Sequence, residues 1–116
     1  MAAIYLKRVY EPASAGDGFR ILVDRLWPRG LSKDKASIDY WAKDIAPSDA
    51  LRKWFAHDPA KWAIFQRRYI AELKRSEAAL KELQKILHTK KAITLLYAAK
   101  DQQHNQAIVL KKMLST

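Results

Sequence analysis

Two nearly continuous apolar runs constrain the fold of this chain more than any other feature. The first is Ile21-Leu22-Val23, within the segment Phe19–Leu26, and the second is the segment Ala92–Ala98. A strand with one buried face alternates apolar and polar residues, whereas a strand covered on both faces is apolar throughout. Both runs are therefore predicted to be buried strands of a sheet that is covered on two sides.

The N-terminal half predicts two further extended segments. Ile4–Tyr10 alternates and is rich in β-branched and aromatic residues, which is typical of a first strand. Ile38–Trp41 is compatible with a short strand or with an irregular packed segment. The strand that begins at Phe19 is expected to end at Trp27-Pro28-Arg29-Gly30, because a residue before proline is disfavoured in helical conformation and glycine tolerates a positive φ.

Capping patterns predict the first helices. Ser48 is a plausible N-cap of a short helix, and Asp58-Pro59 repeats the pattern of a cap followed by proline at the first helical position. One long amphipathic helix is then predicted from Pro59 to about His88. Its apolar positions recur at intervals of three, four or seven: Trp62, Phe65, Tyr69, Leu73, Leu80, Leu83 and Leu87.

A last helix is predicted to begin between Asp101 and Asn105, with Ile108, Val109 and Met113 facing inward. The order of strands and helices favours an α/β fold: a single three-layer domain over residues 1–116 with a small, partly parallel sheet flanked by helices. A chain of 116 residues fits one domain of ordinary size.

Composition excludes several chemistries. The chain has no cysteine, which excludes disulfides, thiol nucleophiles, iron–sulfur clusters and cysteine-ligated zinc. It has no apolar run of the roughly 18 residues that a membrane span requires, and no secretory leader pattern at its start. We therefore expect a cytoplasmic protein without a membrane partner, and the sequence indicates no oligomeric state.

The net charge of +10 admits nucleic acids, anionic small molecules and acidic surfaces as partners. Residues 59–116 carry +8 of it and residues 1–58 only +2. The long helix could offer a basic track to a nucleic acid, although Glu72, Glu77 and Glu82 interrupt it and Glu77 is spaced to pair with Lys81. An ordinary solvated helix face explains the same pattern. The basic side chains are Lys61, Arg67, Arg68, Lys74, Arg75, Lys81 and Lys85.

Polar residues follow both buried strands. In open α/β sheets ligands bind beyond the carboxyl ends of the strands, so parallel neighbours would bring these residues into one composite site. After the first strand they are Asp24, Arg25 and Arg29, and after the second they are Lys100, Asp101, His104 and Asn105.

The residues after the first strand, together with Lys100, form the predicted ligand-binding set. Arg25 and Arg29 can bind a phosphate or carboxylate through a planar guanidinium, and Arg29 lies in a rigid Pro-Arg-Gly turn. Asp24 and Arg25 can equally form a structural ion pair. Trp27 is either a wall for a flat ligand or part of the core.

The predicted catalytic set is Asp101, His104 and Asn105. Asp101 either caps the last helix or orients His104, which can act as a general acid or base near neutral pH. Asn105 can donate to a developing negative charge. If Asp101 is the cap, His104 and Asn105 lie in the first helical turn, where backbone N–H groups favour anions. Two candidate ligands of mixed type do not predict a metal site, and no cofactor is expected.

These residues favour a cleft for an anionic or phosphate-bearing small molecule, and any reaction there is expected to be hydrolysis or group transfer. A nucleic-acid-binding protein that uses the basic helices is the first alternative. A protein-interaction module with an exposed apolar patch around Trp41 or Trp54 is the second.

The chain contains the stretch Leu22-Val23-Asp24-Arg25-Leu26-Trp27-Pro28-Arg29-Gly30. This stretch and several shorter motifs resemble the YeaO-like proteins, which belong to the bacterial family called domain of unknown function 488 (DUF488). The resemblance spans nearly the whole chain and implies a compact α/β fold without an established reaction. In the wider family a Cys-His-Arg cluster often follows the last strand, whereas this chain has no cysteine there. The motifs are Asp17-Gly18-Phe19-Arg20, Leu22-Val23-Asp24-Arg25-Leu26-Trp27-Pro28-Arg29-Gly30, Tyr40-Trp41, Ala46-Pro47-Ser48, Leu51-Arg52-Lys53-Trp54-Phe55, His57-Asp58-Pro59, Thr94-Leu95-Leu96-Tyr97-Ala98-Ala99-Lys100-Asp101 and His104-Asn105.

Overall fold

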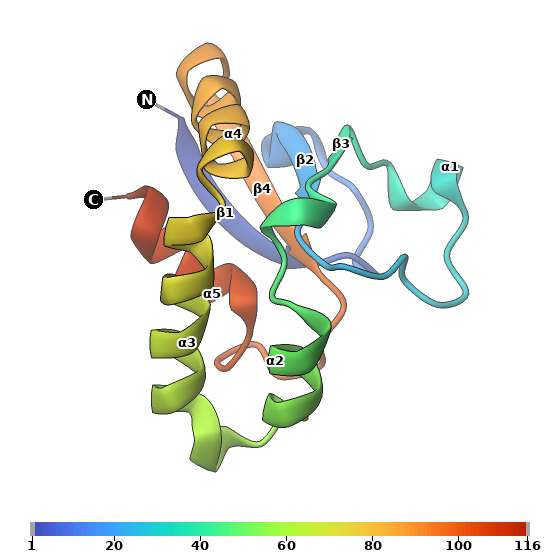
Figure 1. The fold of residues 1–116 in the computed structure, drawn as a ribbon. Helices are drawn as coiled ribbons and strands as arrows, with labels where there is room; N and C mark the ends of the chain where they lie inside the picture. The colour runs from blue at the N-terminus through green and yellow to red at the C-terminus, as the bar shows by residue number, and fades with distance from the viewer. Residues whose placement is uncertain (1, 116) are drawn as a thin grey trace.

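The computed structural model describes residues 2–115, which form a four-stranded sheet with helices packed against it (Figure 1). The strand order is β1-β4-β2-β3, and every neighbouring pair is parallel. The predicted α/β class is therefore confirmed, and the sheet is parallel throughout rather than in part. The strands are β1 (Ala3–Arg8), β2 (Phe19–Leu22), β3 (Tyr40–Trp41) and β4 (Ala92–Tyr97).

The predicted caps start helices at the expected positions. The Ser48 hydroxyl accepts a hydrogen bond from the backbone N–H of Leu51 at 3.2 Å, and the Asp58 carboxylate accepts one from Ala60 at 3.0 Å. The α-helices are α1 (Lys33–Ala36), α2 (Asp49–Phe55), α3 (Trp62–Arg75), α4 (Glu77–Thr89) and α5 (Gln106–Leu114), and the 3₁₀ helices are η1 (Ala15–Asp17), η2 (Lys43–Ile45) and η3 (Pro59–Lys61).

The prediction of a single long helix from Pro59 to about His88 is wrong. The helix is interrupted at Ser76, which separates α3 from α4. Ser76 has φ −102° and ψ 52°, and its hydroxyl donates to the Glu72 carbonyl at 3.1 Å. A serine that bonds its own helix backbone competes with the helical hydrogen bonds. The apolar stripe continues across the break, so periodicity alone does not reveal it.

The two faces of the sheet are covered differently. Ile21, Ile93 and Leu95 pack with the buried residues of α2, α3, α4 and α5, while Leu22 and Leu96 point to the opposite face. There they meet loop residues from the segment 24–41, which includes the short helix α1. Four helices therefore cover one face, and a thinner layer of loop covers the other (Figure 1).

The motif Asp17-Gly18-Phe19-Arg20 builds a buried ionic cluster at the start of β2. The Asp17 carboxylate lies 2.5 Å from Arg20 Nη1 and 3.0 Å from Lys7 Nζ, and the Thr94 hydroxyl donates to the Asp17 carbonyl at 2.7 Å. Burial alone would raise the pKa of Asp17, but hydrogen bonds from Ser14, Lys7 and Arg20 hold it well below its ordinary value. This motif therefore stabilises the fold and lies outside the cavity described below.

Within the described residues, none of the helices combines the length and the apolar character that crossing a membrane demands.

Candidate functional site

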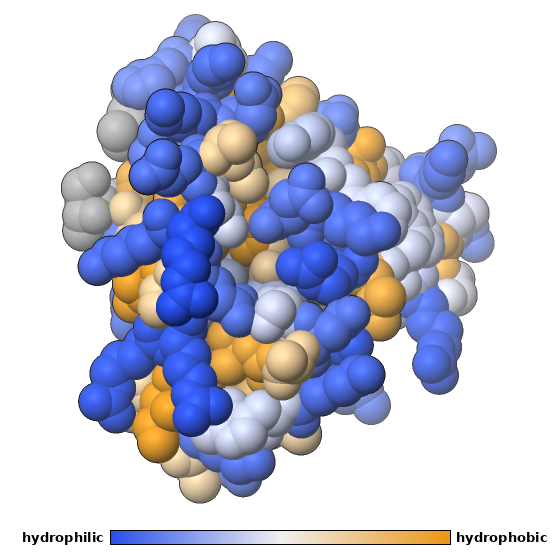
Figure 2. All heavy atoms as spheres, in the orientation of Figure 1, coloured by the Kyte–Doolittle hydropathy of each residue, from blue (hydrophilic) through white to orange (hydrophobic). Residues whose placement is uncertain are grey.

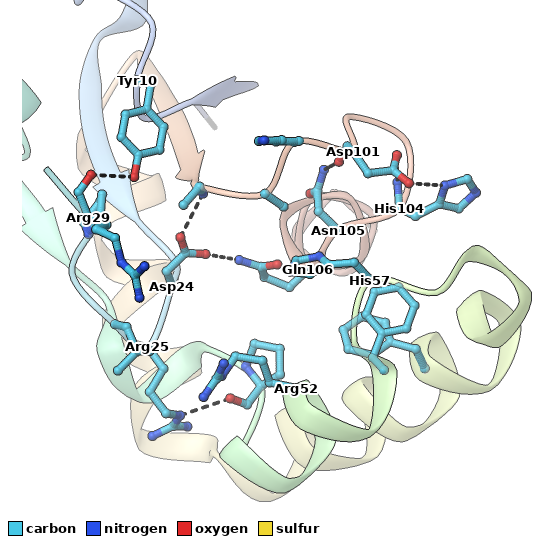
Figure 3. Close-up of a pocket in the computed structure, with 18 of the residues that line it drawn as sticks. Tyr10, Asp24, Arg25, Arg29, Arg52, His57, Asp101, His104, Asn105 and Gln106 are labelled. Atoms are coloured by element: carbon cyan, nitrogen blue, oxygen red, sulfur yellow. Dashed lines mark hydrogen bonds and ion pairs between the residues drawn. The ribbon is translucent and has the colours of Figure 1, made fainter. Parts of the chain in front are cut away.

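A cavity of about 700 Å³ opens where β2 and β4 end (Figure 3). The two strands are parallel neighbours, with Leu22 opposite Leu96, so the segments that follow them leave the sheet at the same edge. The structure brings every predicted site residue to this cavity; their roles in binding or catalysis stay predictions. The predicted residues that line it are Asp24, Arg25, Trp27, Arg29, Lys100, Asp101, His104 and Asn105.

The helical layer completes the cavity with residues that the sequence did not indicate. Phe55 and Phe65 stack with ring centroids 4.3 Å apart and form an apolar wall. Arg52 and His57 add basic groups from α2 and the turn after it. These positions follow from the packing of α2 and α3 against the sheet edge, which no local pattern encodes. The same cavity is also lined by Tyr10, Leu26 and Gln106.

Asp24 joins the two strand ends. Its carboxylate accepts a hydrogen bond from the backbone N–H of Ala98 at 2.8 Å and another from the side-chain amide of Gln106. Burial raises the pKa of Asp24 to about 6, although these two hydrogen bonds and the charge of Arg52 act in the opposite direction. No cation among residues 2–115 forms an ion pair with it.

Asp24 and Arg25 do not form the ion pair that the sequence analysis considered. Arg25 instead donates from Nε to the Pro47 carbonyl at 3.0 Å and from Nη2 to the Ala46 carbonyl at 3.1 Å. These carbonyls precede α2, so Arg25 fastens the end of β2 to the start of the helical layer. Its guanidinium is at least partly committed to the protein.

Trp27 packs as part of the second apolar cluster. Its ring meets Trp41 edge to face at 5.5 Å, and its indole N–H donates to the Leu31 carbonyl at 2.7 Å. The packing interpretation of Trp27 is therefore confirmed. Trp27 also lines the cavity, so its use as a wall for a ligand stays a prediction.

Arg29 and Lys100 are the exposed cations of the predicted ligand-binding set. The backbone carbonyl of Arg29 accepts a hydrogen bond from the Tyr10 hydroxyl at 2.9 Å, which holds the turn in place. The Arg29 side chain extends from this turn toward the side of the cavity where Asp24 and Arg25 lie (Figure 3). Neither cation has a hydrogen-bonded or ion-paired side-chain partner within residues 2–115.

The last helix begins later than it would if Asp101 were its N-cap. Asn105 is the N-cap of α5, with its side-chain oxygen accepting from Ile108 N–H at 3.2 Å. Asp101 caps the preceding turn instead, accepting from Gln103 N–H at 2.9 Å and His104 N–H at 3.1 Å. His104 and Asn105 therefore precede the first helical turn. Both residue types are common caps, so the sequence could not choose between them.

Asp101 also orients His104, as the second interpretation of Asp101 proposed. Its carboxylate lies 2.9 Å from His104 Nδ1, which leaves Nε2 as the ring nitrogen not engaged by this contact. The hydrogen bond from Gln103 N–H, followed by the contacts with His104, lowers the pKa of Asp101. An Asp-oriented histidine at the edge of a cavity can bind an anion or move a proton.

Both the nitrogen and the oxygen of the Asn105 side-chain amide form hydrogen bonds within the protein. Its nitrogen donates to the Asp101 carbonyl at 3.0 Å while its oxygen caps α5, and the residue is only 2% exposed.

Of the three residues expected to face inward from α5, Val109 is buried, whereas Ile108 and Met113 are half-buried. The inner face of the helix is formed mainly by Ala107, Val109, Leu110 and Leu114.

The turn after α2 holds its backbone in an uncommon conformation. Ala56 has φ 46° and His57 has φ 57°, so two consecutive residues with side chains occupy the left-handed region. This turn places the His57 ring 6.4 Å from the Phe55 ring, at the cavity wall. Such strain is often found at functional sites, which makes His57 a candidate that sequence patterns missed.

Comparison with known proteins identifies the family. A family model described as "Inactive DUF488-N3 subclade" matches residues 3–116. The chain belongs to the DUF488 family. It is 48% identical to the uncharacterized protein YeaO of Escherichia coli K12 over 111 residues, which is 96% of each chain. It is 41% identical to the uncharacterized protein Rv3073c of Mycobacterium tuberculosis H37Rv over 112 residues, covering 97% of this chain and 93% of the relative. No solved structure matches it.

Among the described residues of this DUF488 chain, no metal ligand set accompanies the cavity. Within residues 2–115 there is no group of three or more His, Asp or Glu side chains arranged to hold a metal ion. Asp101 and His104 form a pair without a third ligand.

The basic surface of this DUF488 chain lies on the helical side of the molecule, where hydrophilic side chains crowd over α3 and α4 (Figure 2). The predicted pair between Glu77 and Lys81 does not form; in the described part of the chain the ion pair on α4 is Glu82 with Lys85, at 3.5 Å. Lys61 and Arg68 lie over the ring of Trp54, with Nζ 5.1 Å and Cζ 4.4 Å from its centroid.

The two tryptophans proposed as centres of an apolar patch are both half-buried. Basic side chains cover Trp54, and Trp41 donates its indole N–H to the Asp24 carbonyl at 2.7 Å. The exposed large apolar side chains lie elsewhere, at Tyr5, Tyr10, Leu26, Tyr40 and Ile64.

Proposed function

We propose that this DUF488 protein binds a small molecule with a phosphate or carboxylate group in the cavity at the ends of β2 and β4. The observation that carries this proposal is the open pair of cations, Arg29 and Lys100, beside a cavity that also contains Arg52 and His57. A guanidinium without a partner is well suited to a bidentate contact with a phosphate or carboxylate.

The rest of the cavity suggests the character of such a ligand. Its volume of about 700 Å³ lies in the range of ordinary small-molecule sites. The stacked rings of Phe55 and Phe65 offer an apolar surface, and the exposed Leu26 lies at the rim. A ligand with a charged end and an apolar body would use both parts.

A binding screen with a charge-matched control tests the proposal. Inorganic phosphate, sugar phosphates, nucleotides and dicarboxylates are titrated into the wild type, Arg29→Ala and Arg67→Ala, and binding is measured by calorimetry and thermal shift. Arg67 lies exposed on α3 outside the residues that line the cavity, so its variant loses the same charge elsewhere. We expect Arg29→Ala to bind about tenfold more weakly and Arg67→Ala to bind like the wild type. Equal effects of the two variants, or no ligand at all, would reject the proposal.

A hydrolytic or group-transfer step is the catalytic form of this proposal, and the contact between Asp101 and His104 favours it. In the hydrolytic form we take water as the nucleophile, with His104 Nε2 accepting its proton, because the cavity lining contains no serine, threonine or cysteine. The description of the matching subclade as inactive favours binding without turnover. Release of nitrophenol from nitrophenyl phosphate and nitrophenyl acetate by the wild type, above the rate of His104→Ala, would establish catalysis.

Nucleic-acid binding through α3 and α4 is the second candidate, favoured by the exposed basic side chains and by the stacking of Arg68 on Trp54. It predicts affinity for oligonucleotides that falls steeply with salt. That affinity should be lost when Arg67, Arg68, Lys74 and Arg75 are neutralised together, and it should survive Arg29→Ala. The small-molecule proposal predicts that anion binding is weakened in Arg29→Ala and survives the neutralisation of these four basic residues.

A further inference from the structure

The carboxylate of Asp24 is a feature of the cavity that anion binding does not explain. A carboxylate can accept about four hydrogen bonds, and the protein supplies two, from the Ala98 N–H and the Gln106 amide. Both donors are neutral. A largely buried carboxylate without a cationic partner is costly, and here it lines a cavity large enough for a ligand.

Apart from the exposed cations Arg29 and Lys100, the charged groups around Asp24 are already engaged. Arg25 bonds to two carbonyls, and Arg52, from α2, lies 3.4 Å from Asp49. Tyr69, from α3, stays neutral because burial raises its pKa far above the ordinary value. On the loop after β4, Asp101 is matched by His104. Among the described residues that line the cavity, Asp24 is thus the acidic group whose hydrogen bonds come only from neutral amide donors, whereas Asp101 also contacts His104.

We propose that the ligand is a zwitterion whose ammonium group donates to Asp24 while its phosphate or carboxylate is held by Arg29. This inference rests on the proposed function and adds a second recognition point to it. Both residues belong to the segment that follows β2, and their side chains lie on the same side of the cavity (Figure 3). The site would therefore select molecules that carry an amine close to the anionic group.

A matched pair of probes isolates the ammonium contact. Calorimetric titrations compare 2-aminoethyl phosphate with ethyl phosphate, which lacks the amine, on the wild type, Asp24→Asn, Arg29→Ala and Asp34→Asn. Asp34 is an exposed carboxylate on α1, outside the residues that line the cavity, and serves as the charge-matched control. We expect the wild type and Asp34→Asn to prefer the amine-bearing probe by about tenfold, because a hydrogen bond to a charged group is stronger than a neutral one.

The outcomes separate this inference from the proposed function. Loss of the preference in Asp24→Asn, with ethyl phosphate still bound, supports the ammonium contact. Binding of both probes with equal affinity by the wild type overturns the zwitterion and leaves the anion site standing, as does a preference that persists in Asp24→Asn. If neither probe nor any other anion binds, the proposed function fails first.

A pH series on the wild type tests the same contact without a substitution. The probes are 2-aminoethanesulfonate and ethanesulfonate, whose sulfonate stays charged throughout. Because the pKa of Asp24 is raised to about 6, the preference for the amine should fade as the pH drops from about 8 to about 5. A pH-independent ratio in Asp24→Asn would assign the change seen in the wild type to Asp24. A constant ratio in the wild type overturns the inference.

Discussion

The carboxylate of Asp24 accepts a hydrogen bond from the backbone N–H of Ala98 at 2.8 Å, which joins the segments that follow the two central strands. One segment carries Arg29 and the other carries Lys100. Burial raises the pKa of this carboxyl group to about 6. The junction between the two segments therefore contains a group whose charge changes with pH.

Asp24 should make the protein less stable as the pH rises from about 4 to about 6. Its folded-state pKa of about 6 lies above the ordinary 3.8, so the folded state holds the proton more tightly than the unfolded state. The resulting decrease in the free energy of unfolding reaches its full size above about pH 6 and amounts to about 3 kcal/mol at most. Chemical denaturation at about pH 8 should show Asp24→Asn to be more stable than the wild type, with a smaller difference near pH 4. The control Asp34→Asn should show no such trend.

Asp17→Asn should destabilise the fold by about 3 kcal/mol, because it leaves the Arg20 guanidinium buried without its countercharge. The lowered pKa of Asp17 has the opposite linkage to that of Asp24: its stabilising effect is present above about pH 4 and is lost as the pH falls further. Urea denaturation measures the loss. The exposed ion pair between Asp49 and Arg52 provides the comparison, and Asp49→Asn should cost less than about 1 kcal/mol. Similar losses in the two variants would contradict the importance of the buried cluster.

Substitution by alanine should change the stability of the protein to a different extent at each of the three glycines. Gly18 has φ 65°, and an added Cβ would lie 2.3 Å from the Ala92 carbonyl oxygen, so Gly18→Ala should cost at least about 2 kcal/mol. Gly30 has φ 75° but open space around it, so its variant should cost only about 1 kcal/mol. Gly16→Ala should change stability by less than about 0.5 kcal/mol, because nothing lies within 4 Å and its φ is not positive. Thermal unfolding of the three variants tests this order, which an equal loss at Gly16 and Gly18 would contradict.

Ala56→Gly should stabilise the protein by about 0.5–1 kcal/mol, because it relieves a left-handed backbone at φ 46°. The comparison substitution Ala78→Gly, at an exposed position in the first turn of α4, should destabilise the protein by up to about 1 kcal/mol. Opposite signs in urea denaturation would establish the strain in the turn that carries His57. If both variants lose stability, the turn is not strained.

The sequence predicted the parts of this fold that depend on local patterns. The apolar runs at Ile21-Leu22-Val23 and Ala92–Ala98 marked the two central strands, because a strand buried on both faces has few polar residues. The end of the first strand was predicted too late: β2 ends at Leu22, before the turn that starts at Trp27. The break at Ser76 was missed because Leu73 and Leu80 keep the helical spacing across it. The start of α5 was predicted only as a range, from Asp101 to Asn105, because both are common cap residues, and the structure has Asn105 as the cap.

The candidate site was predictable only on the side formed by the sheet. The rule that ligands bind beyond parallel strand ends was enough to bring Asp24, Arg29 and His104 together. The opposite wall, with Arg52 and His57, depends on how α2 and α3 pack, and this tertiary arrangement leaves no local signal. The hydrogen bonds of Arg25 were missed for the same reason: their acceptors are backbone carbonyls more than twenty residues away.

The strand order has a consequence for how the chain reaches its native state. β4 lies between β1 and β2 but is made about 70 residues after β2 ends. Until it is present, β1 has no partner in the sheet and β2 has only its two-residue pairing with β3. The chain must therefore close a long loop before its main pairings form, and such nonlocal pairing slows folding. In a nascent chain that ends before Ala92, β1 and β2 lack the strand that pairs with both of them, and their apolar faces stay exposed. We expect chaperones to bind such a chain.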